Sequence, residues 1–165
     1  MEPLKRILLV EDSPRDAELV LEALSANHLA KEVVSLSDGL EALDYLYRRG
    51  QFAGRGNGQP AVILLHLKMP KVDGTEVLRQ IKGDPQLKVI PVIVMTSSRE
   101  GLDLHTSYQL AANAYVVKPL KFQDFVEAVT HLGAFWAFVN EAPPGSVPRP
   151  TCGVGAWASP VFHAA

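Results

Sequence analysis

Residues 7–14 read Ile-Leu-Leu-Val-Glu-Asp-Ser-Pro, a stretch that changes abruptly from apolar to polar. A short run of branched apolar side chains without alternation is typical of a strand buried on both faces of a parallel sheet. Ser13 and Pro14 then form a helix start signal, because serine caps the first turn and proline fits the first helical position. The stretch therefore predicts a buried parallel strand that leads directly into a helix.

The same alternation of strand and helix continues along the chain. Further strands are predicted over 32–36, 61–65, 89–95 and 114–117, and helices over 13–27, 38–47, 76–82, 102–110 and 122–140. Right-handed crossovers place the helices of such a chain on both faces of one sheet. We therefore expect an α/β fold, with a doubly wound five-stranded parallel sheet in the flavodoxin-like order 2-1-3-4-5 and five helices.

Composition narrows the class of protein. The 165 residues are 47% hydrophobic, which is enough for one core, and we expect a single domain over residues 1–140. Residues 141–165 are rich in proline and glycine without periodicity, which predicts an extended C-terminal tail.

The net charge of -2 comes without long runs of one sign, so we expect neither a nucleic-acid nor a membrane partner. A single cysteine, Cys152, and an N-terminus without a long apolar stretch favour a cytoplasmic protein.

Polar side chains follow four of the predicted strands. Glu11 and Asp12 follow the first strand, His66 the third, Thr96 the fourth and Lys118 the fifth. The carboxyl ends of parallel strands meet along one edge of a doubly wound sheet, and ligands of such folds bind at that edge. Each residue alone could be a helix cap or a strand terminator, but their coincidence at matching strand ends favours a functional site.

Over residues 5–132 the chain resembles the receiver domains of two-component response regulators. The resemblance rests on separate motifs in the family's order, namely Glu11-Asp12, the sequence Met-Pro-Lys-Val-Asp-Gly at 69–74, Thr96, and Tyr115 three residues before Lys118-Pro119. Within that family, the last helix with its extension looks most like the stand-alone receivers paired with phytochrome histidine kinases. The resemblance implies a phosphorelay protein whose partner is a sensor histidine kinase of the phytochrome class.

The chemistry of the family explains why these residue types occur together. In receivers, three carboxylates hold Mg²⁺, and the third of them attacks the phosphohistidine of the kinase. The resemblance implies that Glu11 and Asp12 supply two metal ligands and that Lys118 and Thr96 contact the phosphoryl group. It further implies that Tyr115 changes rotamer when Thr96 moves, which would couple the site to the neighbouring surface.

This chain departs from the family at the phosphoacceptor position, where it has His66 and relatives have aspartate. An imidazole cannot form an acyl phosphate and is a poor ligand for Mg²⁺, so we expect phosphorylation to be lost and Mg²⁺ binding to be weakened or absent. Two alternatives stay open: a relay histidine that itself takes phosphate, and a transition-metal site of His66 with Glu11 and Asp12. A smaller departure is Ala111, in a segment where relatives have a glycine.

Three classes of function are compatible with these features. The leading hypothesis is a stand-alone signalling receiver that is not an enzyme. The alternatives are a non-phosphorylatable binding or titration protein for a histidine kinase, and a metal-binding doubly wound enzyme. The aromatic residues Phe135, Trp136 and Phe138 cover more than one face of the last helix, so they either pack on the sheet or form a dimer contact. We expect a homodimer whose interface includes them.

Overall fold

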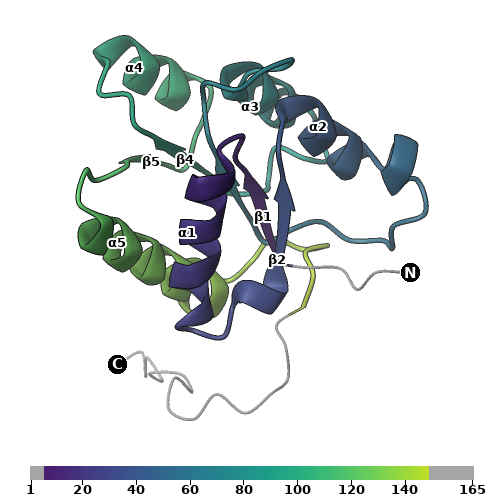
Figure 1. Ribbon diagram of the computed structural model, residues 1–165. Helices are drawn as coiled ribbons and strands as arrows, with labels where there is room; N and C mark the ends of the chain where they lie inside the picture. The colour runs from purple at the N-terminus through teal and green to yellow at the C-terminus, as the bar shows by residue number, and fades with distance from the viewer. Residues whose placement is uncertain (1–5, 149–165) are drawn as a thin grey trace, which may run out of the picture.

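Five parallel strands form one sheet in the order β2-β1-β3-β4-β5 in the computed structural model, which describes residues 6–148 (Figure 1). The strands are β1 (Ile7–Val10), β2 (Val33–Leu36), β3 (Val62–Leu65), β4 (Val92–Thr96) and β5 (Ala114–Val117). Central strands β1, β3 and β4 are wholly buried, whereas the edge strand β5 is half-buried along its length. The predicted fold class and strand order are confirmed.

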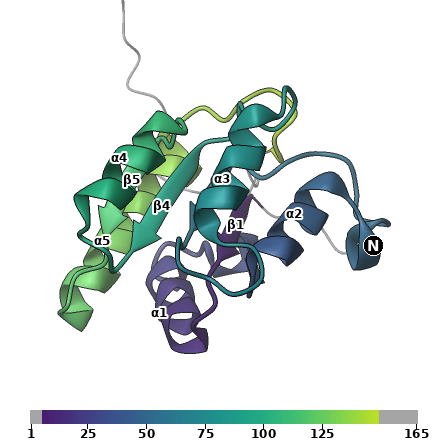
Figure 2. The ribbon, with the colours of Figure 1, turned by 90° about the horizontal axis from the view of Figure 1, so that it is seen from above.

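Five helices cover the two faces of the sheet. They are α1 (Pro14–Ser25), α2 (Gly39–Tyr47), α3 (Gly74–Gly83), α4 (Gly101–Gln109) and α5 (Phe122–Ala134). Helices α1 and α5 share one face, and α2, α3 and α4 lie side by side across the other (Figures 1 and 2). No helix between residues 6 and 148 combines the length and the apolar composition that a membrane span needs.

The core forms two apolar layers, one on each side of the sheet. Leu8 and Val10 of β1 pack with buried residues of α2 and α3, whereas Ile7 and Leu9 pack with those of α1 and α5. Successive side chains of a strand point to opposite faces, so a continuously apolar strand serves both layers. Burial on both faces explains why the strands lack polar alternation.

Carboxylate and hydroxyl caps place the helix starts at the carboxyl edge of the sheet. The side chain of Ser13 accepts a hydrogen bond from Asp16 N, that of Asp38 from Glu41 N, and that of Asp73 from the first turn of α3. Each cap satisfies a backbone N–H that the helix leaves without a partner. The Asp73 cap also starts α3 at Gly74, two residues before the predicted start.

The start of β4 and the geometry of the last helical turn also differ from the prediction. Strand β4 begins at Val92 and not at residue 89, because residues 84–90 make local turns through hydrogen bonds such as Ile90 N to Leu87 O at 2.9 Å. The last helix reaches the predicted end near residue 140, but its final turn, η3 (Phe135–Val139), is π-helical.

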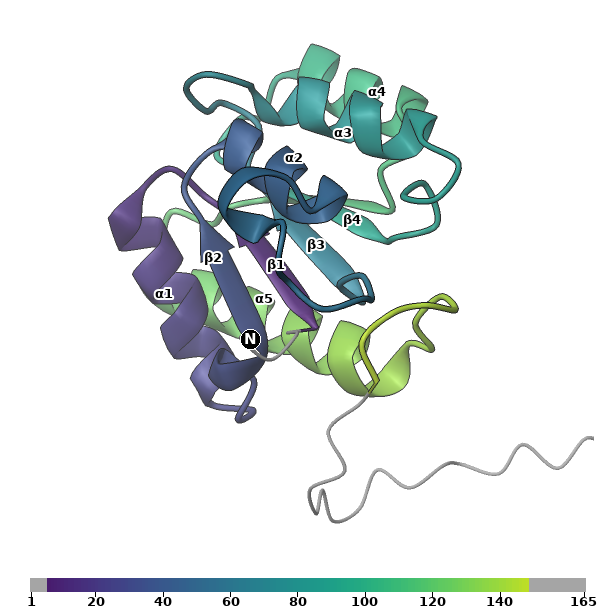
Figure 3. The same cartoon turned by 90° about the vertical axis from the view of Figure 1, so that its right-hand side faces the viewer.

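The C-terminal segment crosses the amino-terminal end of the sheet, away from the strand ends that carry the polar residues (Figure 3). Gln59, just before β3, donates from its backbone N–H to Gly145 O at 3.0 Å and accepts from Val147 N at 2.9 Å. The guanidinium of Arg6 donates to Val147 O. The start of the predicted tail is therefore hydrogen-bonded to the domain, and residues 149–165 of that tail lie outside the described residues.

Candidate functional site

Four strand ends deliver the candidate residues to one edge of the sheet. The ladder of backbone hydrogen bonds continues one residue past the strands, with Glu11 N bonded to Leu36 O at 3.0 Å and His66 N to Val10 O at 3.0 Å. Lys118 N likewise donates to Thr96 O at 2.7 Å. These bonds hold the three backbones at one level, so their side chains leave the sheet at the same edge.

The imidazole of His66 is held by a hydrogen bond to a backbone carbonyl of β4 and not by the acidic pair. Its Nδ1 lies 3.1 Å from Met95 O, and a carbonyl only accepts, so Nδ1 carries the proton. The other ring nitrogen, Nε2, lies 3.8 Å from Asp12 Oδ1, and Nδ1 lies 3.7 Å from Glu11 Oε2. The backbone of β4 therefore orients the imidazole, with Nε2 facing the carboxylate of Asp12.

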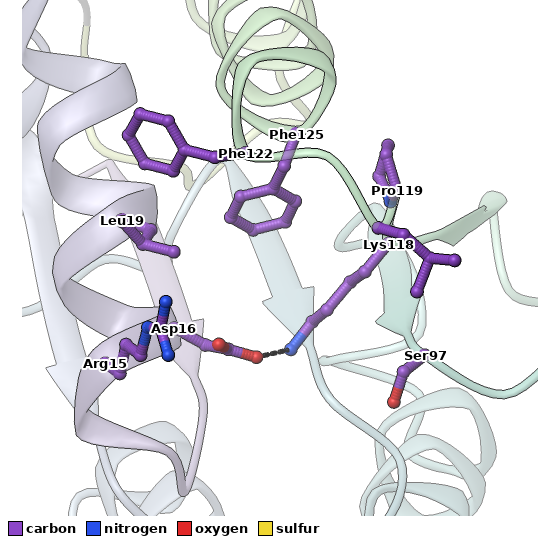
Figure 4. Close-up of a pocket in the computed structure, with 9 residues that line it drawn as sticks. Arg15, Asp16, Leu19, Ser97, Lys118, Pro119, Phe122 and Phe125 are labelled. Carbon is purple, nitrogen blue, oxygen red and sulfur yellow. Dashed lines mark hydrogen bonds and ion pairs between the residues drawn. The ribbon is translucent and has the colours of Figure 1, made fainter.

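Lys118 binds two carboxylates. Its ammonium lies 2.6 Å from Glu11 Oε2 and 2.7 Å from Asp16 Oδ2, the latter contact shown in Figure 4. The second oxygen of Glu11, Oε1, accepts from Ser13 N at 3.2 Å. Both Glu11 and Lys118 are buried, and a buried charge is tolerated when it is paired and hydrogen-bonded in this way.

Asp16 is a site residue that sequence reasoning missed. It stands in the first turn of α1, where an acidic residue is explained by the helix dipole and by the Ser13 cap. Its contact with Lys118 joins residues 102 positions apart. The only sequence signal was its place one helical turn after the acidic pair, which indicates that it lies near the same edge.

Thr96 and Tyr115 are connected through the loop that follows β4. The hydroxyl of buried Thr96 accepts from Ser98 N at 3.1 Å, and the hydroxyl of Tyr115 donates to Ser98 O at 3.2 Å. Burial raises the pKa of Tyr115, and the carboxylate of Asp103 acts in the same direction. The phenol therefore stays a hydrogen-bond donor at neutral pH, and Ser98 links the side chains of Thr96 and Tyr115.

Two contacts hold the loop that follows β3, one at Gly74 and one at Lys71. A Cβ added to Gly74 would lie 2.1 Å from His66 O, so only glycine allows this close approach. Lys71 forms an ion pair with Asp38 at the start of α2. Burial opposes ionisation of Asp38, but the hydrogen bond from Lys71 outweighs it together with the helix cap, and the pKa of Asp38 is lowered.

Glu11, Asp12 and His66 form a group that could bind a metal ion, with one ligand atom of each within 4.8 Å of the others. Mg²⁺ strongly prefers oxygen ligands in octahedral geometry. Here the imidazole of His66 stands where Mg²⁺ would need an oxygen donor. These residues therefore do not fit Mg²⁺.

A hollow of about 280 Å³ opens beside Lys118, between α1 and the segment that joins β5 to α5 (Figure 4). Its lining combines charged and apolar side chains, namely Arg15, Asp16, Leu19, Ser97, Lys118, Pro119, Leu120, Phe122 and Phe125. Leu120 is 97% exposed and Phe122 is 52% exposed. Apolar side chains thus border the approach to the strand-end residues.

The fold and this arrangement agree with a comparison against known families. A model described as the response regulator receiver domain matches residues 7–130. The chain belongs to the receiver-domain family. This is a family of signalling domains, and the predicted family is thereby confirmed.

Individual receivers show the same likeness. Response regulator Rcp1 of Synechocystis sp. is 42% identical over 134 residues, which cover 81% of this chain and 90% of Rcp1. The bacteriophytochrome response regulator RtBRR is 56% identical, with a TM-score of 0.68 and 87% of each chain covered. The Mn²⁺-bound form of Rcp1 has a TM-score of 0.79 at 40% identity, over 84% of this chain and 99% of that structure. The predicted likeness to receivers associated with phytochromes is also confirmed.

The predicted site residues of this receiver fall into two places. Glu11, Asp12, His66, Thr96 and Lys118 share the carboxyl edge of the sheet, and Tyr115 reaches it through Ser98. The aromatic residues of the last helix lie elsewhere: Trp136 and Phe138 are partly buried against the core layer of α1 and α5. Of the three dimer candidates, Phe135 is the exposed one, at 47%, and Val139 nearby is 58% exposed.

Proposed function

We propose that this receiver acts in a phytochrome-linked phosphorelay by binding a histidine kinase without accepting its phosphate. The observation that carries the proposal is His66 at the end of β3, where the family has its phosphoacceptor aspartate. Acyl phosphate formation needs a carboxylate nucleophile, and an imidazole whose Nδ1 is bonded to Met95 O does not supply one. The domain is then a non-enzymatic competitor that occupies the kinase and withholds it from other receivers.

The neighbouring carboxylates are poor substitutes for the missing nucleophile. Glu11 is buried and bonded to Lys118 and to Ser13 N, so its oxygens already have partners. Asp12 has a third of its side chain exposed, but its carboxylate faces His66 Nε2 at 3.8 Å. Neither takes the place at the end of β3 from which the family's aspartate reacts.

The side chains around position 66 supply the surface that we propose for kinase binding. Lys118, Thr96 and Tyr115 are in contact with the strand-end loops, and Phe122 and Leu120 border the hollow beside Lys118. The likeness to RtBRR and to other phytochrome response regulators supports a kinase of the phytochrome class as the partner. We propose a cytoplasmic homodimer as the working form, with the exposed residues Phe135 and Val139 at its contact.

The experiment is phosphotransfer from a phosphorylated bacteriophytochrome kinase to the full chain. We expect the kinase to bind the chain and to keep its phosphate, with no gain of one phosphate in the intact mass of the receiver. The same kinase must lose its phosphate to a receiver that carries the family's aspartate. A rapid, hydroxylamine-sensitive gain of mass on this chain would overturn the proposal, and mapping the label would show whether Asp12 had reacted.

A further inference from the structure

We infer that Glu11, Asp12 and His66 form a binding site for a transition-metal ion of the Zn²⁺ or Co²⁺ type in preference to Mg²⁺. The inference concerns the same site as the proposed function. It rests on the proposed function only for the premise that His66 is the functional side chain at the end of β3. It requires no phosphate and no kinase. The argument has three parts: the orientation of the imidazole, the spacing of the ligand atoms, and the local charge.

The imidazole already has the orientation of a metal ligand. Histidines that bind metals commonly donate their second ring N–H to a carbonyl or carboxylate, which fixes the tautomer and the direction of the free nitrogen. His66 donates from Nδ1 to Met95 O, so Nε2, which faces Asp12 Oδ1, is the nitrogen left to offer a lone pair to a metal ion. No rearrangement of the ring is needed to offer a nitrogen ligand to an ion beside Asp12.

The spacing of the ligand atoms suits a small ion with nitrogen and oxygen ligands. Bonds of about 2.0–2.2 Å in tetrahedral geometry separate two ligand atoms by roughly 3.3–3.6 Å. Nε2 of His66 and Oδ1 of Asp12 are 3.8 Å apart, and all three side chains offer atoms within 4.8 Å of one another. A small rotation of Glu11 would complete the group, and solvent at the partly exposed Asp12 would provide further ligands.

The local charge also favours a divalent cation. Lys118 pairs with the carboxylates of Glu11 and Asp16, and the carboxylate of Asp12 faces His66, so three carboxylates accompany one ammonium and the net charge of these four groups is -2. Asp16 matters here because it gives Lys118 a second partner 2.7 Å away. Glu11 could therefore turn toward an ion without leaving the buried ammonium unpaired.

Metal identity follows from the donor set. Imidazole suits Zn²⁺, Co²⁺ and Ni²⁺, whereas Mg²⁺ is held by oxygen and gives up its water reluctantly. Transition ions bind most sites more tightly than Mg²⁺, so the informative quantity is the ratio of the Co²⁺ and Mg²⁺ affinities in two variants that differ only at position 66. The His66→Asp variant replaces the nitrogen by oxygen and provides that comparison.

The test is a titration of the full-length, metal-free chain with Co²⁺, followed by its visible absorption, and with Mg²⁺, followed by calorimetry. We expect the Co²⁺ to Mg²⁺ affinity ratio to be at least about 100-fold larger in the wild type than in His66→Asp. His66→Ala should lose the Co²⁺ bands of the wild-type site. His105→Ala, a change of an exposed histidine on α4, should keep them. A Cys152→Ser, His163→Ala variant of the full chain should also keep them, which removes the tail as the source of binding.

Equal ratios in the wild type and His66→Asp, or Co²⁺ bands that survive in His66→Ala, would overturn the inference. Asp12→Asn gives a second check if His66→Ala does not fold, because Asp12 is partly exposed and its loss should weaken Co²⁺ binding by about 10-fold or more. The metal titration and the phosphotransfer experiment test separate claims. If Co²⁺ does not bind, the metal site is rejected, but the proposal that the receiver binds a kinase without accepting phosphate still stands. If the wild type gains phosphate, the proposed function is rejected whatever the metal titration shows.

Discussion

The ammonium of Lys118 lies 2.6 Å from Glu11 Oε2, and both side chains are buried at the carboxyl edge of the sheet. In a competent receiver we expect this lysine to contact a phosphoryl oxygen. Here it neutralises Glu11 and is shared with Asp16, so the pair also contributes to stability. Removing one partner of such a pair leaves an uncompensated buried charge, which costs far more than the pair itself contributes.

Lys118→Met should therefore destabilise the domain by about 3 kcal/mol, because Glu11 would lose its ammonium partner in a buried position. The double variant Glu11→Gln with Lys118→Met should recover a large part of that loss. Urea denaturation gives the free energy of unfolding of each protein. Arg79→Met is the control, because both partners of the Arg79–Glu76 ion pair are exposed and its loss should have little effect. A double variant as unstable as the single one would contradict the assignment of the cost to Glu11.

Restoring the family's carboxylate should restore phosphate uptake. We expect His66→Asp to accept phosphate from a bacteriophytochrome kinase, because Lys118 and Thr96 are in place at the neighbouring strand ends. Kinase phosphate loss and receiver phosphate gain should be followed in the same reaction, which separates failure to bind from failure to react. His66→Asn is the matched control, since it has the size of aspartate without its charge. If His66→Asp takes up no phosphate, the defect lies in the kinase-binding surface or in the loops around Thr96.

Replacing Ala111 by glycine should stabilise the domain. It follows α4 with a φ of 64°, in the left-handed region that glycine adopts without steric cost and that commonly ends helices. We expect Ala111→Gly to raise the free energy of unfolding by about 0.5–1 kcal/mol, after the added entropy of the unfolded chain is deducted. Ala112→Gly is the control, because Ala112 is buried and φ is ordinary there, so glycine should destabilise. A loss of stability in Ala111→Gly would show that the strain is relieved in solution.

Stability should depend on Lys82 in alkaline solution. Its ammonium donates to Lys88 O, Ile90 O and Asn113 Oδ1, and burial lowers its pKa from 10.5 to about 8. Between those two values the unfolded chain binds more protons than the folded one, so this group makes the protein more stable as pH rises from 8 to 10.5. Denaturation at pH 7, 9 and 10 should show this gain in the wild type relative to Lys82→Met. Lys88→Met, at an exposed lysine, should follow the wild type, and a parallel pH profile for Lys82→Met would reject the lowered pKa.

The proposed homodimer should depend on the exposed side of the last helical turn. Phe135→Ser with Val139→Ser should shift the protein to monomer in light scattering, because both residues are exposed apolar groups on η3. Trp136 is unsuitable for this test, since it packs against the core layer. Leu102→Ser, at a 73% exposed residue of α4, is the control and should leave the mass unchanged. A wild type that is monomeric at high concentration would exclude the interface.

The order of strands and helices, the family, and the identity of the strand-end residues followed from the sequence alone. Each depends on local information: a continuous apolar run such as 62–65, a cap such as Asp73, or a polar residue directly after a strand. The parallel topology then determines that Glu11, His66 and Lys118 share one edge, because all carboxyl ends of the strands point the same way.

The partners of those residues were decided only by the tertiary structure. Met95 O orients His66 across 29 residues, and Asp16 shares Lys118 across 102. No motif marks Met95, and the spacing of Asp16 from the acidic pair places it near the edge without identifying Lys118 as its partner. The same holds for Gln59, whose bonds to Gly145 and Val147 fix the start of a tail that composition alone predicts to be extended. Periodicity reports which face of an element is buried, but hydrogen bonds and ion pairs depend on distances of a few tenths of an ångström between distant segments, and those distances exist only once the layers have packed.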